Sequence, residues 1–239
     1  MPALPAFATV VVPTYNEREN LESLVRMILE QGHEIRVLVV DDNSPDGTGA
    51  LADRLAAEEP RLTILHRRKK QGIGRAYLAG FHCALAQGAT YIIEMDADFS
   101  HDPADLPRLL DPVRSGRADL VLGSRWTDGG GTRNWPLDRR LISKGGSLYA
   151  RSILQLDVRD LTGGFKCFNR RVLEALDLDG VRSNGYAFQI ELTYRALRAG
   201  FRVVEIPIVF TERALGSSKM SRQIALEAMA MVWRLRFAR

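Results

Sequence analysis

The chain has 239 residues, of which 46% are hydrophobic and 26% are charged, and its formal net charge is +4. This composition is that of a globular protein long enough to bury one substantial core. It excludes a membrane-spanning chain, since no stretch approaches roughly 20 apolar residues, and the lack of nucleic-acid-binding motifs argues against a nucleic-acid partner.

Short apolar runs alternate with amphipathic segments of helical length along the first half of the chain. We predict strands at Phe7–Val12, Ile35–Val40, Leu62–Leu65, Tyr91–Met95 and Leu120–Leu122. The helices between them are predicted at Glu17–Gln31, Thr48–Glu59, Gly74–Gln87 and Pro103–Ser115. Such alternation is typical of an α/β fold in which helices cover both faces of a mostly parallel sheet.

From Trp126 onward the pattern is less regular, beginning with a glycine-rich loop at Thr127–Arg133. Further strands are predicted at Phe165–Phe168 and Arg202–Ile206, and helices at Leu137–Gln155, Ala187–Ala199 and Arg222–Phe237. No basic residue precedes the first apolar run, so we predict a buried strand there and not a signal peptide. We expect a catalytic domain over residues 1–220 and a basic amphipathic helix over 221–239, which either contacts a membrane surface or packs on the domain.

Polar residues follow four of the predicted strands, at the sheet edge where α/β folds bind ligands. These residues are Pro13 to Glu17, Asp41 to Ser44, Asp96 to Asp98, and Gly123 to Arg125. Gly72 and Gly74 are followed by Tyr77 where a dinucleotide-binding motif needs a third glycine, and GxxxxGK[ST] does not occur. The sequence therefore argues against a dehydrogenase and against a P-loop NTPase.

Asp96 and Asp98 directly follow the apolar run that ends at Met95. Two carboxylates this close repel each other unless a cation lies between them. Hard oxygen ligands, completed by water and diphosphate oxygens, suit Mg²⁺ or Mn²⁺. A solvated turn or a helix cap before Pro103 is the alternative interpretation.

Asp42 ends the second strand, where a carboxylate can accept hydrogen bonds from a nucleobase or a ribose. Alternatively, Asp41, Asp42 and Ser44 cap the helix that follows Pro45. The basic residues Arg125, Arg139, Arg140, Arg213 and Lys219 are candidates for binding phosphate oxygens, with surface solvation as the alternative for each.

The histidines and cysteines show no spacing typical of a metal site. His101 is a candidate near the metal, whereas the other histidines are predicted to be structural or exposed. Cys83 and Cys167 are far apart and flanked by apolar residues, so we predict reduced thiols in a cytoplasmic protein. No combination of side chains indicates a covalent nucleophile.

Nine segments, taken in order, resemble the dolichol-phosphate (polyprenol-phosphate) mannose synthases, which are inverting family 2 glycosyltransferases with a GT-A fold. The segments are VVVPTYNERENL, VVDDNSPDGT, GIGRAYLAGF, MDADFSHDP, GSRW, NWPLDRRLISKGG, TGGFKCF, GYAFQIE and TERALGSSKMS. The resemblance extends from about Ala8 to Met220. The first segments are shared with the wider glycosyltransferase group, whereas the NWP and GSSK segments indicate the polyprenol-phosphate branch.

The resemblance implies a role for each matching residue. Pro13, Tyr15, Glu17, Val40 and Asp42 would form the guanosine pocket, and Asp96, Ala97 and Asp98 would hold the metal and the diphosphate. Ser100 stands where some members place a glutamine ligand of the metal. Arg125 would lie near the sugar diphosphate, Arg139 and Ser143 would meet the acceptor phosphate, and Arg213 and Lys219 would close over the donor. Asp96, Asp98 and Arg125 are thus the predicted catalytic residues.

The reaction implied by the resemblance is transfer of mannose from GDP-mannose to a polyprenyl (dolichyl) phosphate, which releases GDP. One alternative is transfer of another sugar, such as glucose from UDP-glucose or a hexosamine, to polyprenyl phosphate or to a polysaccharide. The other is a non-catalytic nucleotide-sugar-binding subunit. Many members carry transmembrane helices or a partner that does. We therefore expect a protein peripheral to the cytoplasmic face of a membrane, held by its last helix, an anchoring partner or a further segment.

Overall fold

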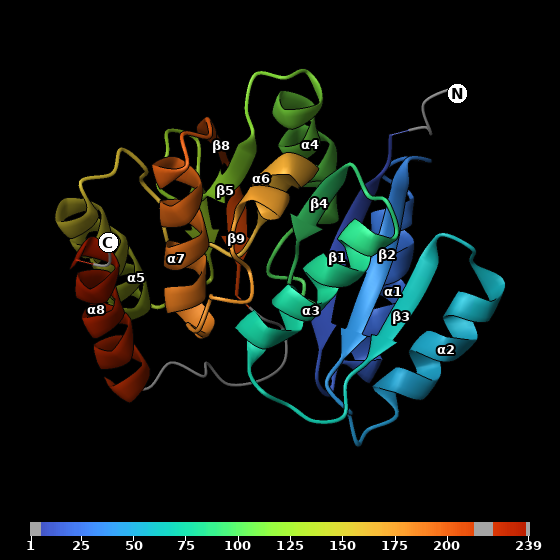
Figure 1. The fold of residues 1–239 in the computed structure, drawn as a ribbon. Helices are drawn as coiled ribbons and strands as arrows, with labels where there is room; N and C mark the ends of the chain where they lie inside the picture. Colours follow the sequence, from blue (N-terminus) through green and yellow to red (C-terminus); the bar gives the residue numbers. More distant parts are fainter. Residues whose placement is uncertain (1–5, 213–221, 238–239) are drawn as a thin grey trace.

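A seven-stranded sheet forms the centre of the molecule, with strand order β3-β2-β1-β4-β7-β5-β8 (Figure 1). The computed structural model describes residues 6–212 and 222–237, with side chains in the last helix from residue 229 onward. The strands are β1 (Ala8–Thr14), β2 (Ile35–Asp41), β3 (Leu62–His66), β4 (Tyr91–Glu94), β5 (Leu120–Ser124), β7 (Lys166–Asn169) and β8 (Val203–Pro207). Neighbouring strands are parallel except where β7 pairs with β4 and β5.

Helices cover both faces of the sheet because alternate residues of each strand point to opposite sides. Val10 and Val12 of β1 belong to one apolar cluster, and Val11 belongs to the other. The first cluster includes residues of α1 (Arg18–Leu29), α2 (Thr48–Glu58) and α4 (Leu106–Arg114), which follows the short helix η1 (Pro103–Asp105). The second includes residues of α3 (Ile73–Ala86), α6 (Arg170–Ala175) and α7 (Gly185–Arg198).

Two further helices, α5 (Leu137–Leu154) and α8 (Arg222–Phe237), lie side by side at the end of the molecule away from β3 (Figure 1). Helix α8 also contacts α7. Val232 and Leu235 of α8 are buried against these neighbours, whereas Trp233 and Phe237 are exposed. The last helix thus packs on the domain with one face, and the boundary at residue 220 stays a prediction. Within the described residues, every helix is too short or too polar to cross a bilayer.

The α/β fold predicted from the sequence is confirmed, because a mostly parallel sheet is covered by helices on both faces. Three short elements were not predicted: α6, β6 (Gly131–Arg133) and β9 (Val209–Thr211). The last two pair in parallel as a separate two-stranded sheet. The prediction of a loop over all of Thr127–Arg133 is therefore wrong at its end, since strands of three residues are too short to produce a recognisable alternation.

Candidate functional site

A cavity of about 680 Å³ opens at the carboxyl ends of β1, β2 and β4. The strand-end residues that line it are Pro13, Thr14, Tyr15, Glu17, Asp42, Asp96, Ala97 and Asp98. Three of the four predicted polar loops therefore meet at one site, as expected for the carboxyl edge of a parallel sheet. The fourth loop follows β5, and Gly123 to Arg125 are not among the residues that line the cavity.

The carboxylates of the loop after β2 do not all face the cavity. Asp41 accepts hydrogen bonds from the Thr14 hydroxyl at 3.1 Å and from the Ser44 hydroxyl at 2.5 Å, which ties the loops after β1 and β2 together. Asp46 accepts from the backbone N–H of Thr48 at 3.0 Å, in the first turn of α2. Asp42 faces the cavity instead. The carboxylates that hold the loop together are therefore Asp41 and Asp46, and the side chain that lines the cavity is Asp42.

Asp42 is held in place by an ion pair with Arg67, whose side chain is itself largely buried. Burial raises the pKa of Asp42 above its ordinary value, and the Arg67 charge opposes that rise. Close by in sequence, Lys70 lies over the ring of Tyr15, with its Nζ 3.6 Å from the ring centroid. The segment between β3 and α3 therefore supports the part of the cavity wall that Asp42 and Tyr15 form.

The acidic pair after β4 is anchored by two different contacts. Tyr77 of α3 donates a hydrogen bond from its hydroxyl to Asp96 Oδ1 at 2.9 Å, and its ring stacks on Phe188 of α7. Burial and the Asp96 charge raise the pKa of Tyr77 well above its ordinary value, so this hydroxyl stays a donor. Asp98 accepts from the backbone N–H of Ser100 at 3.1 Å. Both carboxylates line the cavity, because the buried strand β4 ends just before them at the sheet edge.

Ser100 and His101 are two buried residues of the same loop. Both are buried, and the Ser100 hydroxyl has no hydrogen-bond partner among the described residues. The His101 ring stacks on Phe165 with the centroids 4.9 Å apart, and its Nδ1 lies 3.4 Å from the backbone N–H of Asp96 as an acceptor. His101 therefore shapes the backbone of the acidic loop. In the described part of the chain, no cluster of three or more His, Cys, Asp or Glu side chains forms a metal site.

A buried charged pair lies under the acidic loop, where Glu94 of β4 is the cross-strand partner of Lys166 of β7. Burial raises the pKa of Glu94 to about 7 against the opposing charge of Lys166. Burial also lowers the pKa of Lys166 to about 8, and its Nζ donates to the backbone carbonyl of Gln189 at 2.7 Å and to the Thr193 hydroxyl at 3.0 Å. The pair therefore joins the sheet to α7 beneath the cavity.

Arg125 does not belong to the described lining of the cavity. Its guanidinium donates to both Asp160 oxygens at 2.7 Å and to the Thr162 hydroxyl at 2.8 Å, and both charged side chains are almost wholly buried. Thr162 does line the cavity. The predicted contact of Arg125 with the sugar diphosphate stays a prediction, because in this structure the side chain supports the wall from behind.

Arg139 and Ser143 lie one turn apart on the inward face of α5. Arg139 lines the cavity, stacks over Trp135 at 4.3 Å and donates from Nη1 to Glu212 at 2.6 Å. Ser143 is buried, and its hydroxyl has no hydrogen-bond partner among the described residues. The two residues share one helix face, so their predicted common role at an acceptor phosphate stays a prediction that this geometry supports.

Of the remaining predicted residues, one lies in the core and two fall outside the described part of the chain. Val40 is fully buried in β2 and belongs to the apolar core. Arg213 and Lys219 lie outside the residues that the structure describes. Their predicted roles as donor-binding residues stay predictions.

The sequence did not reveal the wall that α7 and α8 contribute. It includes Arg182, Asn184, Tyr186, Gln189, Met231 and Arg234. Asn184 packs against the start of α3, where a Cβ on Gly74 would stand 3.0 Å from its Oδ1, so only a glycine lets the two helix starts approach this closely. The GYAFQIE segment was the one available signal for this wall.

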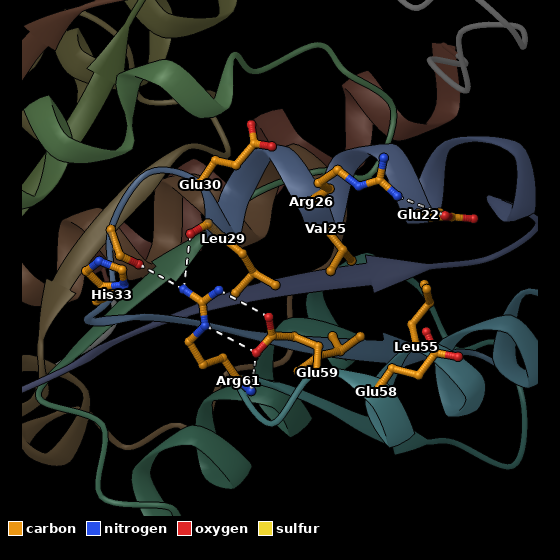
Figure 2. A pocket seen from close by; sticks show the side chains of 12 residues that line it. Glu22, Val25, Arg26, Leu29, Glu30, His33, Leu55, Glu58, Glu59 and Arg61 are labelled. Atoms are coloured by element: carbon orange, nitrogen blue, oxygen red, sulfur yellow. Dashed lines mark hydrogen bonds and ion pairs between the residues drawn. The ribbon is translucent and has the colours of Figure 1, made fainter.

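A second hollow, of about 400 Å³, lies between the carboxyl-terminal halves of α1 and α2. Figure 2 shows Arg61 at one side of it, where its guanidinium donates to the carbonyl oxygens of Leu29 at 3.1 Å and Gly32 at 3.2 Å. The same guanidinium pairs with Glu59. This hollow contains none of the predicted site residues, and the hydrogen bonds of Arg61 are made to the protein itself.

Both cysteines are free thiols, with Cys167 buried in β7 and Cys83 partly buried in α3. Burial raises the pKa of Cys83 above its ordinary value and raises that of Cys167 further. Thiols in this state are poor nucleophiles and poor metal ligands. They have no part in the chemistry of the cavity.

Relatives of known activity and known structure can now be compared with this geometry. Residues 9–177 match the family model described as Glycosyl transferase family 2. The chain is 52% identical over 230 residues to the polyprenol monophosphomannose synthase of Mycolicibacterium smegmatis, covering 95% of this chain and 86% of that protein. It is 50% identical over 224 residues to the undecaprenyl-phosphate mannosyltransferase of Micrococcus luteus, covering 94% of this chain and 91% of that protein.

A solved structure confirms the GT-A fold. The glucosyl-3-phosphoglycerate synthase from Mycobacterium tuberculosis, in complex with Mn²⁺, UDP and phosphoglyceric acid, superposes with a TM-score of 0.72. The sequence identity is 19%, and the match covers 97% of this chain and 79% of that chain. Since the family model matches most of the chain and both curated relatives are about half identical to it, the chain belongs to glycosyl transferase family 2.

Proposed function

We propose that this protein transfers mannose from GDP-mannose to a polyprenyl phosphate, with inversion at the anomeric carbon. The observation that carries the proposal is the meeting of Asp42, Asp96 and Asp98 in one cavity of a chain half identical to two mannose-transferring enzymes. A nucleotide-sugar donor needs both a site for its base or ribose and a site for its diphosphate. The carboxylates after β2 and β4 supply these two sites at one sheet edge.

A divalent ion, Mg²⁺ or Mn²⁺, fits the loop after β4. Asp96 and Asp98 offer hard carboxylate oxygens to the cavity, and the buried Ser100 hydroxyl beside them has no hydrogen-bond partner among the described residues. The ion, when bound, supplies positive charge to the departing diphosphate. Tyr77 holds Asp96 in position, so this loop is preorganised before the donor arrives.

The acceptor side requires little proton chemistry. A polyprenyl phosphate is already an anion, so its oxygen can attack without a strong general base, and the protein must chiefly align it with the sugar. Arg139 lines the cavity from α5, where its guanidinium can orient the acceptor phosphate through hydrogen bonds while its charge is shared with Glu212. Thr162 and Gln189 complete the wall between the donor and α7.

The test is a turnover assay of the purified protein with GDP-mannose or UDP-glucose and a short polyprenyl phosphate. We expect strong preference for GDP-mannose and loss of transfer when EDTA removes the divalent ion. Indifference to EDTA would remove the metal from the mechanism, and preference for UDP-glucose would replace the sugar. Donor binding without any transfer would instead favour a non-catalytic nucleotide-sugar-binding subunit.

A membrane surface is the proposed setting of the reaction, because α5 and α8 together expose a large apolar face. Its exposed residues are Leu137, Leu141, Ile142, Leu148, Met229, Trp233 and Phe237. Lys144 and Arg140 are exposed on the same helix as the leucines, and amphipathic helices of this kind bind anionic lipid surfaces.

Vesicle sedimentation tests this setting. The double variant Leu141→Gln and Trp233→Gln is expected to bind vesicles that contain anionic lipid roughly tenfold more weakly, because it removes two exposed apolar side chains. The matched control is Met27→Gln, since Met27 is an exposed apolar residue on α1, away from this face. Equal binding of the double variant and the control would contradict the proposed membrane face.

A further inference from the structure

Carboxylates already hold two of the arginines that the sequence assigned to phosphate groups. Arg125 is paired with Asp160, and Arg139 is paired with Glu212. An arginine whose charge is balanced by a carboxylate attracts an incoming phosphate less strongly than a free one does. Within the described part of the chain, other cations around the cavity are therefore better placed to attract a phosphate-bearing acceptor.

Among the described residues that line the cavity, the remaining cations are Lys70, Arg182 and Arg234. Lys70 lies over the Tyr15 ring on the nucleotide side. Arg182 precedes α7 and Arg234 belongs to α8, and both side chains are exposed. Neither forms an ion pair or a hydrogen bond with any described residue, whereas the neighbouring Arg195 of α7 is paired with Glu191.

The surroundings of these two arginines combine charge with apolar surface. Ala187 of α7 and Ala230 and Met231 of α8 line the same cavity. A wall that carries both cations and small apolar side chains suits a ligand with a phosphate head and a hydrocarbon tail. Helix α8 also carries the exposed Trp233, so the same helix contributes both to the cavity and to the exposed apolar face.

We propose that Arg182 and Arg234 form a second acceptor-binding pair, which captures the anionic phosphate of the polyprenyl substrate where α7 and α8 border the cavity. This inference rests on the proposed function and adds residues to it. Forked guanidinium groups hold phosphate oxygens through charge-assisted hydrogen bonds. Because both side chains are exposed, salt screens their attraction, and the effect of removing them must fall as ionic strength rises.

The test compares Arg182→Gln, Arg234→Gln and the double variant with wild type, using farnesyl phosphate as acceptor at about 50 mM and about 500 mM salt. At low salt the double variant is expected to raise the KM for farnesyl phosphate roughly tenfold, and at high salt the difference shrinks to about twofold. The KM for GDP-mannose is expected to stay at its wild-type value. Arg236→Gln is the matched control, since Arg236 lies on α8, donates to Gln155 at 2.9 Å and does not line the cavity.

Equilibrium binding of farnesyl phosphate without donor separates this inference from the proposed function. The double variant is expected to bind farnesyl phosphate more weakly than wild type and to bind farnesol equally well. If wild type transfers mannose and the double variant binds farnesyl phosphate as tightly as Arg236→Gln does, the pair is not an acceptor site. If wild type binds farnesyl phosphate through these arginines but transfers no sugar, the proposed function fails and the binding pair stands.

Discussion

Asp98→Asn is expected to lower the turnover of GDP-mannose by roughly 100- to 1,000-fold, because the substitution removes a negative charge that we propose binds the divalent ion beside the diphosphate. The fold is expected to survive. An asparagine oxygen can accept the hydrogen bond that the Ser100 backbone N–H now donates to Asp98. The measurements are kcat/KM for transfer and the midpoint of urea unfolding on the same preparation.

Asp102→Asn is the matched control for this variant. Asp102 belongs to the same loop and accepts a backbone hydrogen bond from Ala104 at 2.9 Å, but it does not line the cavity. Its activity is expected to stay within about twofold of wild type, since an exposed cap keeps its hydrogen bond as asparagine. Near-normal turnover by Asp98→Asn would count against a metal-binding role for the acidic pair.

Asp160→Ala is expected to destabilise the protein by about 3–5 kcal/mol, because it leaves the buried Arg125 guanidinium without a counter-charge. Asp160 is fully buried and accepts hydrogen bonds from the Arg125 backbone, Nε and Nη2. For a chain of this length, that loss corresponds to a fall in Tm of roughly 6–20 °C. Thermal unfolding followed by circular dichroism measures it directly.

The control for this prediction is Glu22→Gln, which breaks the exposed pair between Glu22 and Arg26. That pair has side chains 55% and 70% exposed, and its loss is expected to cost less than about 1 kcal/mol. If Asp160→Ala and Glu22→Gln destabilise the protein equally, the buried pair of Asp160 and Arg125 contributes no more stability than an exposed pair does.

The buried pair of Arg125 and Asp160 also predicts how the stability of the protein depends on pH. Burial alone would raise the pKa of Asp160, but the Arg125 charge and hydrogen bonds outweigh it and hold that pKa below its ordinary value. The stabilisation is therefore present above the unfolded-state pKa of about 4 and is lost as pH falls through the lower folded-state value. Asp160→Ala is expected to lack this part of the acid-induced loss of stability.

The meeting of the strand-end carboxylates in one cavity could be predicted from the sequence because it depends on local rules. Asp42 and Asp96 follow apolar strands of clear pattern, and the carboxyl ends of parallel strands meet at one edge. The strand limits differ from prediction by one or two residues, which is the usual uncertainty at element ends. Short-range pattern thus sufficed wherever strand order followed the simple alternation of strand and helix.

The remaining parts of the site depend on contacts between distant segments. The partner of Arg125 is 35 residues away in sequence, and no pattern around Arg125 indicates that it is buried. Glu94 meets Lys166 only because β7 runs between β4 and β5 in the reverse direction. Arg234 reaches the cavity only because α8 packs against α7. Tertiary packing determined each of these placements.

The reversed direction of β7 has a consequence for how the enzyme can change. A strand that runs backward brings its first residues to the edge where its neighbours finish, so Thr162 and Gly164 border the cavity from the segment that precedes β7. Substitutions in this segment can therefore reshape the wall nearest α7 while the lining residues that follow β1, β2 and β4 stay unchanged. Two sides of one cavity thus come from segments of the chain that mutation can alter independently.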